Sequence, residues 1–174
     1  MSIADSLFHL LTLPQWHALL RTASIGFAPV EAALGDPASG DATSIDRPLD
    51  LAAFQDHKAT LPPYAPPSLT EEGFIHLSSR EQVCGVANRF YQDQGDLILL
   101  EIDPQRLQAD LRWEAPVHPD GSPPEPDAPQ FPHLYGSLNL DAVIEWYNLP
   151  QRDGQFTLPA TLLGADGGSL GHFN

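Results

Sequence analysis

The chain has 174 residues, 23 of them acidic and 8 basic, which gives a formal charge of -15 at pH 7. A surface this acidic repels phosphate backbones and anionic lipid headgroups, so it excludes nonspecific binding to nucleic acids and membranes. The length suits one domain over residues 1–174, and the single cysteine, Cys84, excludes an internal disulfide. We expect a cytoplasmic protein that is a monomer or a weak homo-oligomer, because cysteine usage favours a reducing compartment and the chain has neither a signal-peptide pattern nor a bilayer-length apolar run.

The first segment is predicted to form a strand followed by a helix. Residues 7–11 are apolar except for His9. Thr12 and Gln15 then have the spacing of a capping box, and apolar residues recur at helical intervals after it. Residues 35–48 consist mainly of small and polar residues, which predicts a mobile insertion.

The clearest helix prediction lies in the middle of the chain. Residues 49–58 are expected to form a helix that ends before a run of prolines, and residues 73–77 a strand. Ser79 and Gln82 again have capping-box spacing, and they begin a stripe of apolar residues at helical intervals, formed by Val83, Val86, Ala87, Phe90 and Tyr91. The start of this helix is either an anion site for a carboxylate or phosphate, or is simply capped by a serine.

The second half is predicted to consist mainly of short strands. Residues 97–102 are an apolar run typical of a buried strand, and residues 111–114 and 142–149 are further strands. Residues 115–130 contain six prolines, which predicts a solvated loop and a candidate flap.

The C-terminal part carries a turn signal. Asp153 and Gly154 predict a hairpin, and the glycine-rich residues 160–174 predict a flexible tail. Strands and helices do not alternate regularly along the whole chain, so the expected fold class is α+β, with a mainly antiparallel, split β-sheet and a few short helices.

Two blocks, residues 72–78 and 131–136, carry the candidate site. Each places a histidine two positions before a second polar residue in an apolar run: His76 with Ser78, and His133 with Tyr135. Residues two apart on a strand share a face, so we expect both pairs to line one pocket. The alternative is that each histidine is a hydrogen-bonded structural residue.

Other residues complete the expected site. Arg89 and Arg112 lie near the two blocks and are candidate ligand-binding residues, although a solvated surface charge is the alternative for each. The usual local motifs for dinucleotides, nucleoside triphosphates, zinc and hydrolase serines are absent. A metal held by His76, His133 and Glu114 is an alternative to the metal-free site that we expect.

Five blocks of the chain resemble the DUF952 family in sequence and in order. The most specific are FIHLS and FPHLYG, and the blocks comprise residues 72–91, 96–103, 111–114, 131–143 and 153–159. The family is similar in fold to the ADP-ribosyltransferase superfamily, whose members bind NAD in the cleft of a split β structure. The resemblance implies that His76 contacts the NAD ribose, with Ser78 beside it.

The resemblance also implies roles for the second block. His133 and Tyr135 would lie in the same cleft, where the Tyr135 ring could stack on nicotinamide or another flat group. The late glutamate of such transferases is not identified here. Glu114 is the first candidate for it, and the less favoured candidates, Glu101 and Glu145, follow.

These observations leave three hypotheses for function. The first is an enzyme that transfers or hydrolyses an ADP-ribosyl or glycosyl group, with NAD as substrate and no other cofactor required. The second is acid–base chemistry on an organic metabolite, such as hydrolysis, isomerisation or cyclisation. The third is a protein that binds a nucleotide or metabolite without turnover.

Overall fold

The computed structural model describes residues 6–25, 51–116, 125 and 127–163. The predicted insertion at 35–48, the centre of the 115–130 loop and the tail beyond residue 163 lie outside the described residues. In the described part of the 115–130 loop there is no helix or strand, as predicted.

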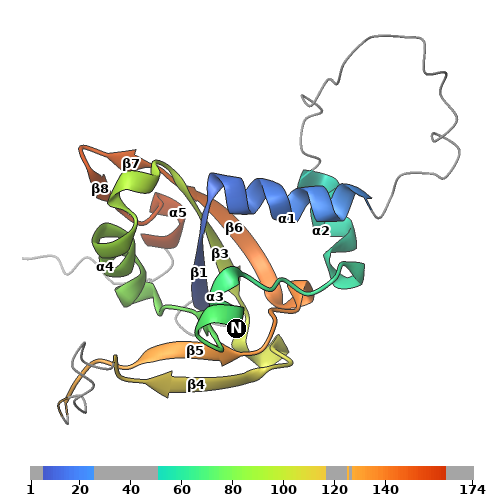
Figure 1. The fold of residues 1–174 in the computed structure, drawn as a ribbon. Helices are drawn as coiled ribbons and strands as arrows, with labels where there is room; N and C mark the ends of the chain where they lie inside the picture. Colours follow the sequence, from blue (N-terminus) through green and yellow to red (C-terminus); the bar gives the residue numbers. More distant parts are fainter. Residues whose placement is uncertain (1–5, 26–50, 117–124, 126, 164–174) are drawn as a thin grey trace, which may run out of the picture.

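Two three-stranded antiparallel sheets form the framework of the fold (Figure 1). The first has the strand order β1-β3-β6, with strands Leu7–Thr12, Leu97–Ile102 and Val143–Leu149. The second has the order β2-β5-β4, with strands Ile75–His76, Phe131–Tyr135 and Asp110–Glu114. A small hairpin pairs β7 (Gln151–Arg152) with β8 (Gln155–Phe156). The predicted α+β class with antiparallel sheets is confirmed.

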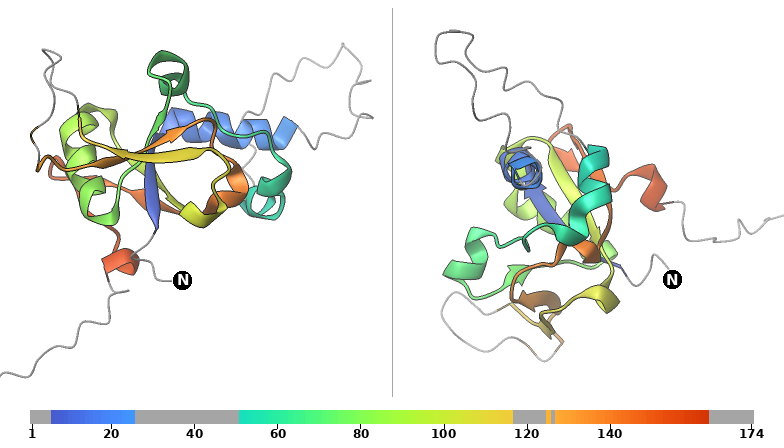
Figure 2. Two further views of the ribbon diagram at one scale, coloured as in Figure 1. Left: turned by 90° about the horizontal axis from the view of Figure 1, so that it is seen from below. Right: turned by 90° about the vertical axis from the view of Figure 1, so that its right-hand side faces the viewer.

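Short helices surround the sheets (Figure 2). The α-helices are α1 (Leu13–Ile25), α2 (Leu51–His57), α3 (Pro67–Glu71), α4 (Arg80–Phe90) and α5 (Ala160–Leu163). The 3₁₀ turns are η3 (Lys58–Thr60), η4 (Gln92–Gln94), η5 (Pro104–Arg106) and η6 (Leu140–Ala142). No helix in the described ranges is long and apolar enough to span a bilayer.

Local sequence signals explain where the main helices begin. The Gln15 side chain accepts a hydrogen bond from the Thr12 backbone amide at 2.9 Å, and Gln82 does the same for Ser79 at 3.0 Å. Both predicted capping boxes are therefore present. Regular structure resumes within the run of prolines after residue 61: α3 begins at Pro67, where the missing amide and fixed φ of proline suit the first helical position.

Two apolar clusters lie on opposite faces of the β1-β3-β6 sheet. Alternate residues of β3 serve each cluster: Ile98 and Leu100 face one, and Leu97 and Leu99 the other. Every residue of β3 is buried, as the apolar run predicted. The first cluster includes residues of α1, α2 and the second sheet, and the second cluster includes residues of α4, β8 and α5.

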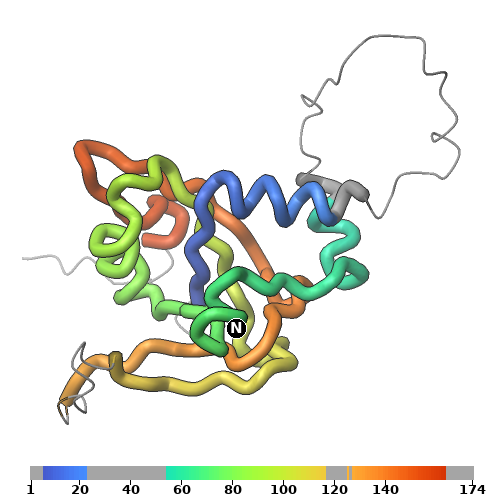
Figure 3. The backbone as a smooth tube through the Cα atoms, viewed as in Figure 1, coloured from blue at the N-terminus to red at the C-terminus, as the bar shows by residue number. Residues whose placement is uncertain are grey.

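The second sheet has one buried and one open face, and this positions the candidate site. Ile75 and Leu134, which are paired across β2 and β5, are fully buried in the first cluster. The side chains of the next residues along these strands, His76 and His133, therefore point away from the core. The chain then runs from β2 directly into α4, as the backbone trace in Figure 3 shows, so the helix begins next to the open face.

Candidate active site

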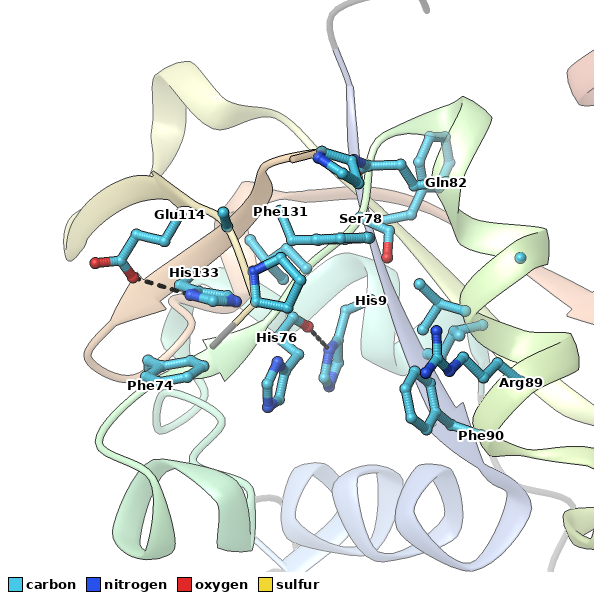
Figure 4. Close-up of a pocket in the computed structure, with 18 of the residues that line it drawn as sticks. His9, Phe74, His76, Ser78, Gln82, Arg89, Phe90, Glu114, Phe131 and His133 are labelled. Carbon is cyan, nitrogen blue, oxygen red and sulfur yellow. Dashed lines mark hydrogen bonds and ion pairs between the residues drawn. The ribbon is translucent and has the colours of Figure 1, made fainter. Parts of the chain in front are cut away.

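An open cleft of about 1430 Å³ is lined by the open face of the second sheet, by part of β1 and by one side of α4 (Figure 4). Six of the seven residues expected from the sequence line it: His76, Ser78, Arg89, Glu114, His133 and Tyr135. The structure therefore brings both histidine blocks to one concavity.

The two histidines are direct neighbours across the antiparallel β2-β5 pair. His76 lies opposite His133 in the register, their ring centroids are 5.3 Å apart, and the rings are nearly perpendicular at 89°. Phe74 packs against both, stacked on His133 at 4.1 Å and edge-on to His76 at 4.8 Å. The His76 Nε2 atom is 2.9 Å from a carboxylate oxygen of Glu72. Phe74 thus contacts both imidazoles, and Glu72 orients that of His76.

A single carboxylate oxygen organises the His133 end of the cleft. The Glu114 Oε2 atom accepts hydrogen bonds from His133 Nδ1 at 2.9 Å and from the Tyr135 hydroxyl at 2.8 Å. These bonds lower the pKa of Glu114, and the bond to Glu114 raises the pKa of Tyr135. Glu114 therefore stays charged at neutral pH. When His133 is neutral, its proton is on Nδ1 and its lone pair is on Nε2.

The sequence reasoning did not include His9 in the site. His9 lies on β1, lines the cleft, and places Nδ1 2.8 Å from the backbone oxygen of His76. Because a carbonyl oxygen only accepts, Nδ1 carries the proton and Nε2 is an acceptor. Burial lowers the pKa of His9 to about 4, so the ring is neutral at pH 7. The only sequence signal was a polar residue within an apolar strand.

The buried neutral state of His9 predicts a pH-dependent stability. Between pH 6.5 and 4 the unfolded chain binds a proton at this histidine and the folded chain does not, so stability falls as the pH falls. From pH 7 to pH 5 the loss from this group is about 2 kcal/mol in the free energy of unfolding. Urea unfolding at both pH values measures it. In His9→Asn, whose amide can replace the Nδ1 donor, the loss should shrink by that amount; an unchanged loss contradicts the assignment.

The start of α4 is capped by the chain itself. The Ser79 hydroxyl donates to the Glu81 carboxylate at 2.8 Å, and the pKa of Glu81 is lowered by its bond with its own backbone amide and by this hydroxyl. The Glu81 carboxylate thus lies at the start of α4, where a ligand anion was one of the two alternatives. The capping box of Ser79 and Gln82 agrees with the other alternative, a serine cap. Ser78 is buried, and its backbone pairs with Phe8 of β1.

The remaining candidates differ in their surroundings. Arg89 lines the cleft, with its guanidinium 5.3 Å from the Phe90 ring. Arg112 is not one of the lining residues: it pairs with Asp110 at 2.8 Å and lies 4.3 Å over the Tyr135 ring. It therefore lies behind the site, where it contacts the Tyr135 ring and pairs with His133 in the β4-β5 register.

The two less favoured glutamates are not in the cleft. Glu101 is 3% exposed within the β1-β3-β6 sheet, and Glu145 is exposed on β6. Glu101 accepts hydrogen bonds from the hydroxyls of Ser6 and Tyr147, each at 2.7 Å. Across the described ranges, no three His, Cys, Asp or Glu side chains are grouped to hold a metal ion, so the geometry does not favour the alternative of a metal on His76, His133 and Glu114.

The molecule is thus an α+β protein with a histidine-lined cleft between an antiparallel sheet and a helix. The chain belongs to the family described as "Protein of unknown function (DUF952)", whose model matches residues 48–146 and so includes both histidine blocks. The resemblance inferred from the sequence motifs is confirmed at the level of this family.

Solved structures of protein CC0527 from Caulobacter crescentus are similar in fold. Its crystal structure shares 22% sequence identity with this chain, covers 91% of this chain and 98% of its own, and has a TM-score of 0.54. A crystal structure of a double mutant of that protein has 21% identity, the same coverages and a TM-score of 0.53. The solution NMR structure has 20% identity, covers 87% and 90%, and has a TM-score of 0.50. No curated protein matches the chain.

Proposed function

We propose that this protein is an enzyme that acts on a small organic molecule in the cleft, with His133 as the proton carrier. The observation that carries the proposal is the Glu114 oxygen that accepts from both His133 Nδ1 and the Tyr135 hydroxyl. It holds the imidazole with a lone pair on Nε2, and its charge stabilises the imidazolium that forms when Nε2 takes a proton. The His133 side chain is 11% exposed, so part of it remains open to the cleft.

The other lining groups suit binding and orientation of such a substrate. His9 supplies a neutral hydrogen-bond acceptor, and His76, paired with Glu72, lies beside His133 as a second polar group. In a proton-transfer cycle, His133 Nε2 removes a proton from a substrate hydroxyl, a substrate carbon or water, and returns it to the leaving group or to another atom of the substrate. Hydrolysis, isomerisation and cyclisation are reactions of this type.

A second candidate is cleavage of the nicotinamide glycosidic bond of NAD, which is then a substrate and not a resident cofactor. One observation favours it: the charged Glu114 bonds the hydroxyl of Tyr135, whose ring contacts that of Phe74. A carboxylate there can stabilise positive charge that develops on a ribose, and the rings can contact a flat cationic group. The resemblance to the DUF952 family implies a fold similar to that of ADP-ribosyltransferases, which supports the same reaction.

The charge of the cleft places this candidate second. Four glutamates are among the lining residues, and Arg89 is the one arginine or lysine among those described. Carboxylates repel the diphosphate of a dinucleotide, and in this cleft they outnumber the cation. A neutral or cationic substrate therefore suits the cleft better than NAD does.

Two experiments test these candidates. First, the melting temperature of the full chain is measured with 1–5 mM NAD, concentrations on the order of a millimolar Kd. A ligand that binds the native state raises the melting temperature. We expect NAD to leave the melting temperature unchanged and no nicotinamide to be released. If the melting temperature rises and nicotinamide is released, cleavage of NAD becomes the first candidate.

Second, the protein is incubated with a metabolite extract, and the compounds consumed are identified by mass spectrometry. We expect consumption by the wild type and by the control His17→Gln on α1, which is outside the cleft, and none by His133→Gln. If the wild type binds compounds without consuming any, the cleft belongs to a binding protein.

A further inference from the structure

Gly85 lies in α4 at a position where the structure gives no reason for a glycine. It lies in the interior of an 11-residue helix, where glycine is less stable than almost any other residue. Its backbone is not among those with positive φ, and a Cβ added to it meets nothing within 4 Å in the described part of the chain. Neither backbone conformation nor close packing therefore requires a glycine here.

Gly85 faces the cleft. Gly85 is exposed and lines the cleft together with Val86 and Phe90, which lie on the same side of α4. Phe90 is 67% exposed, the largest exposed fraction among the large apolar side chains that the structure describes. This part of the helix presents to the cleft bare backbone, two apolar side chains and, one turn on either side of Gly85, the charged side chains of Glu81 and Arg89.

An apolar wall lies on the β5 side of the same space. The Gln82 side-chain amide, one turn before Gly85, donates to the Gln130 backbone oxygen at 2.6 Å and ties α4 to the start of β5. The next residue, Phe131, lines the cleft, as does Pro129. This wall is continuous with the polar residues of the cleft, because Glu114 lies directly opposite Phe131 in the β4-β5 register.

We propose that Gly85 keeps a slot open along α4 for a flat ring of the substrate, which packs between the helix backbone and Phe131 with Phe90 at its edge. A glycine allows a planar group to approach a helix backbone closely, and the rings of Phe131 and Phe90 can pack against such a group. The inference rests on the proposed function and specifies its substrate as a molecule with an aromatic or heteroaromatic ring joined to a polar reacting group.

A matched pair of ring compounds tests the shape of the slot without any turnover. Benzyl alcohol and cyclohexylmethanol carry the same polar group on a flat and on a puckered ring. We expect NMR titration of the full chain to show that benzyl alcohol shifts the amide signals of Gly85, Val86 and Phe131, with an affinity at least about fourfold higher than that of cyclohexylmethanol, the ratio that one methylene of burial gives. Equal affinities overturn the proposal.

Two variants test the role of Gly85 separately from fold stability. Gly85→Ala and Gly85→Leu both favour the helix, so we expect melting temperatures equal to or about 2–4 °C above the wild type. Affinity for benzyl alcohol should fall in the order Gly, Ala, Leu, by about tenfold or more for Leu, which overpacks the slot. Stabilised variants with wild-type affinity contradict the slot. The proposed function is judged instead by turnover in His133→Gln, so either proposal can fail alone.

Discussion

His133→Gln is expected to lower kcat by about 100- to 10,000-fold, the range that a positioned acid–base group contributes. The substitution removes the imidazole that Glu114 orients, and glutamine cannot exchange a proton near neutral pH. The measurement is turnover of a compound that the wild type consumes in the metabolite screen, with ligand affinity determined in parallel. Retained affinity with lost turnover is the expected pattern.

Glu114→Gln separates positioning from proton transfer. Because Glu114 acts on the substrate through His133, the variant should lower kcat by about tenfold or more while KM changes less. Nitrogen NMR of the imidazole gives an independent readout: in the wild type the neutral ring carries its proton on Nδ1, and Glu114→Ala, which leaves no acceptor there, should lose this preference. If His133→Gln turns over substrate like the wild type, or the Nδ1 proton persists without Glu114, the mechanism is wrong.

Glu101→Ala is expected to lower the free energy of unfolding by about 3–5 kcal/mol. The variant removes the acceptor of the Ser6 and Tyr147 hydroxyls and leaves a cavity in the β1-β3-β6 sheet. Tyr147→Phe, which removes one hydrogen bond to a charged group, should cost about 1.5–3 kcal/mol. The pKa of Tyr147 is raised by burial and by the hydrogen bond to Glu101, which agrees with a neutral hydroxyl donating to a carboxylate.

Glu145 provides a matched control for this prediction. It lies directly opposite Glu101 in the β3-β6 pair, but its side chain is exposed. Glu145→Ala should therefore change stability by no more than about 0.5 kcal/mol. Urea unfolding at pH 7 measures all three variants. A Glu101→Ala protein as stable as the Glu145→Ala control would falsify a structural role for the buried carboxylate.

Predictions from local sequence succeed where a short segment satisfies its own backbone groups. The capping residues Thr12 and Ser79 begin α1 and α4, and the Asp153-Gly154 pair forms the β7-β8 turn with φ values of 50° and 75°. The strand at residues 73–77 is shorter than predicted, because β2 pairs with β5 only at Ile75 and His76. Helix α5, within the segment expected to be a flexible tail, depends on Leu162, which is buried in the second core cluster.

The amino-acid sequence by itself determined the α+β class, the two histidine blocks and the faces on which their side chains lie, because alternation along a strand is a local property. Only the tertiary structure decided that His76 lies opposite His133, that Glu114 bonds both His133 and Tyr135, and that the His9 ring is held by the backbone of His76. It also placed the Glu81 carboxylate beside Ser79 at the start of α4, which the sequence left open as an anion site or a serine cap. Such contacts depend on strand register and on long-range packing, which join residues far apart in the chain and leave no periodic pattern in the sequence.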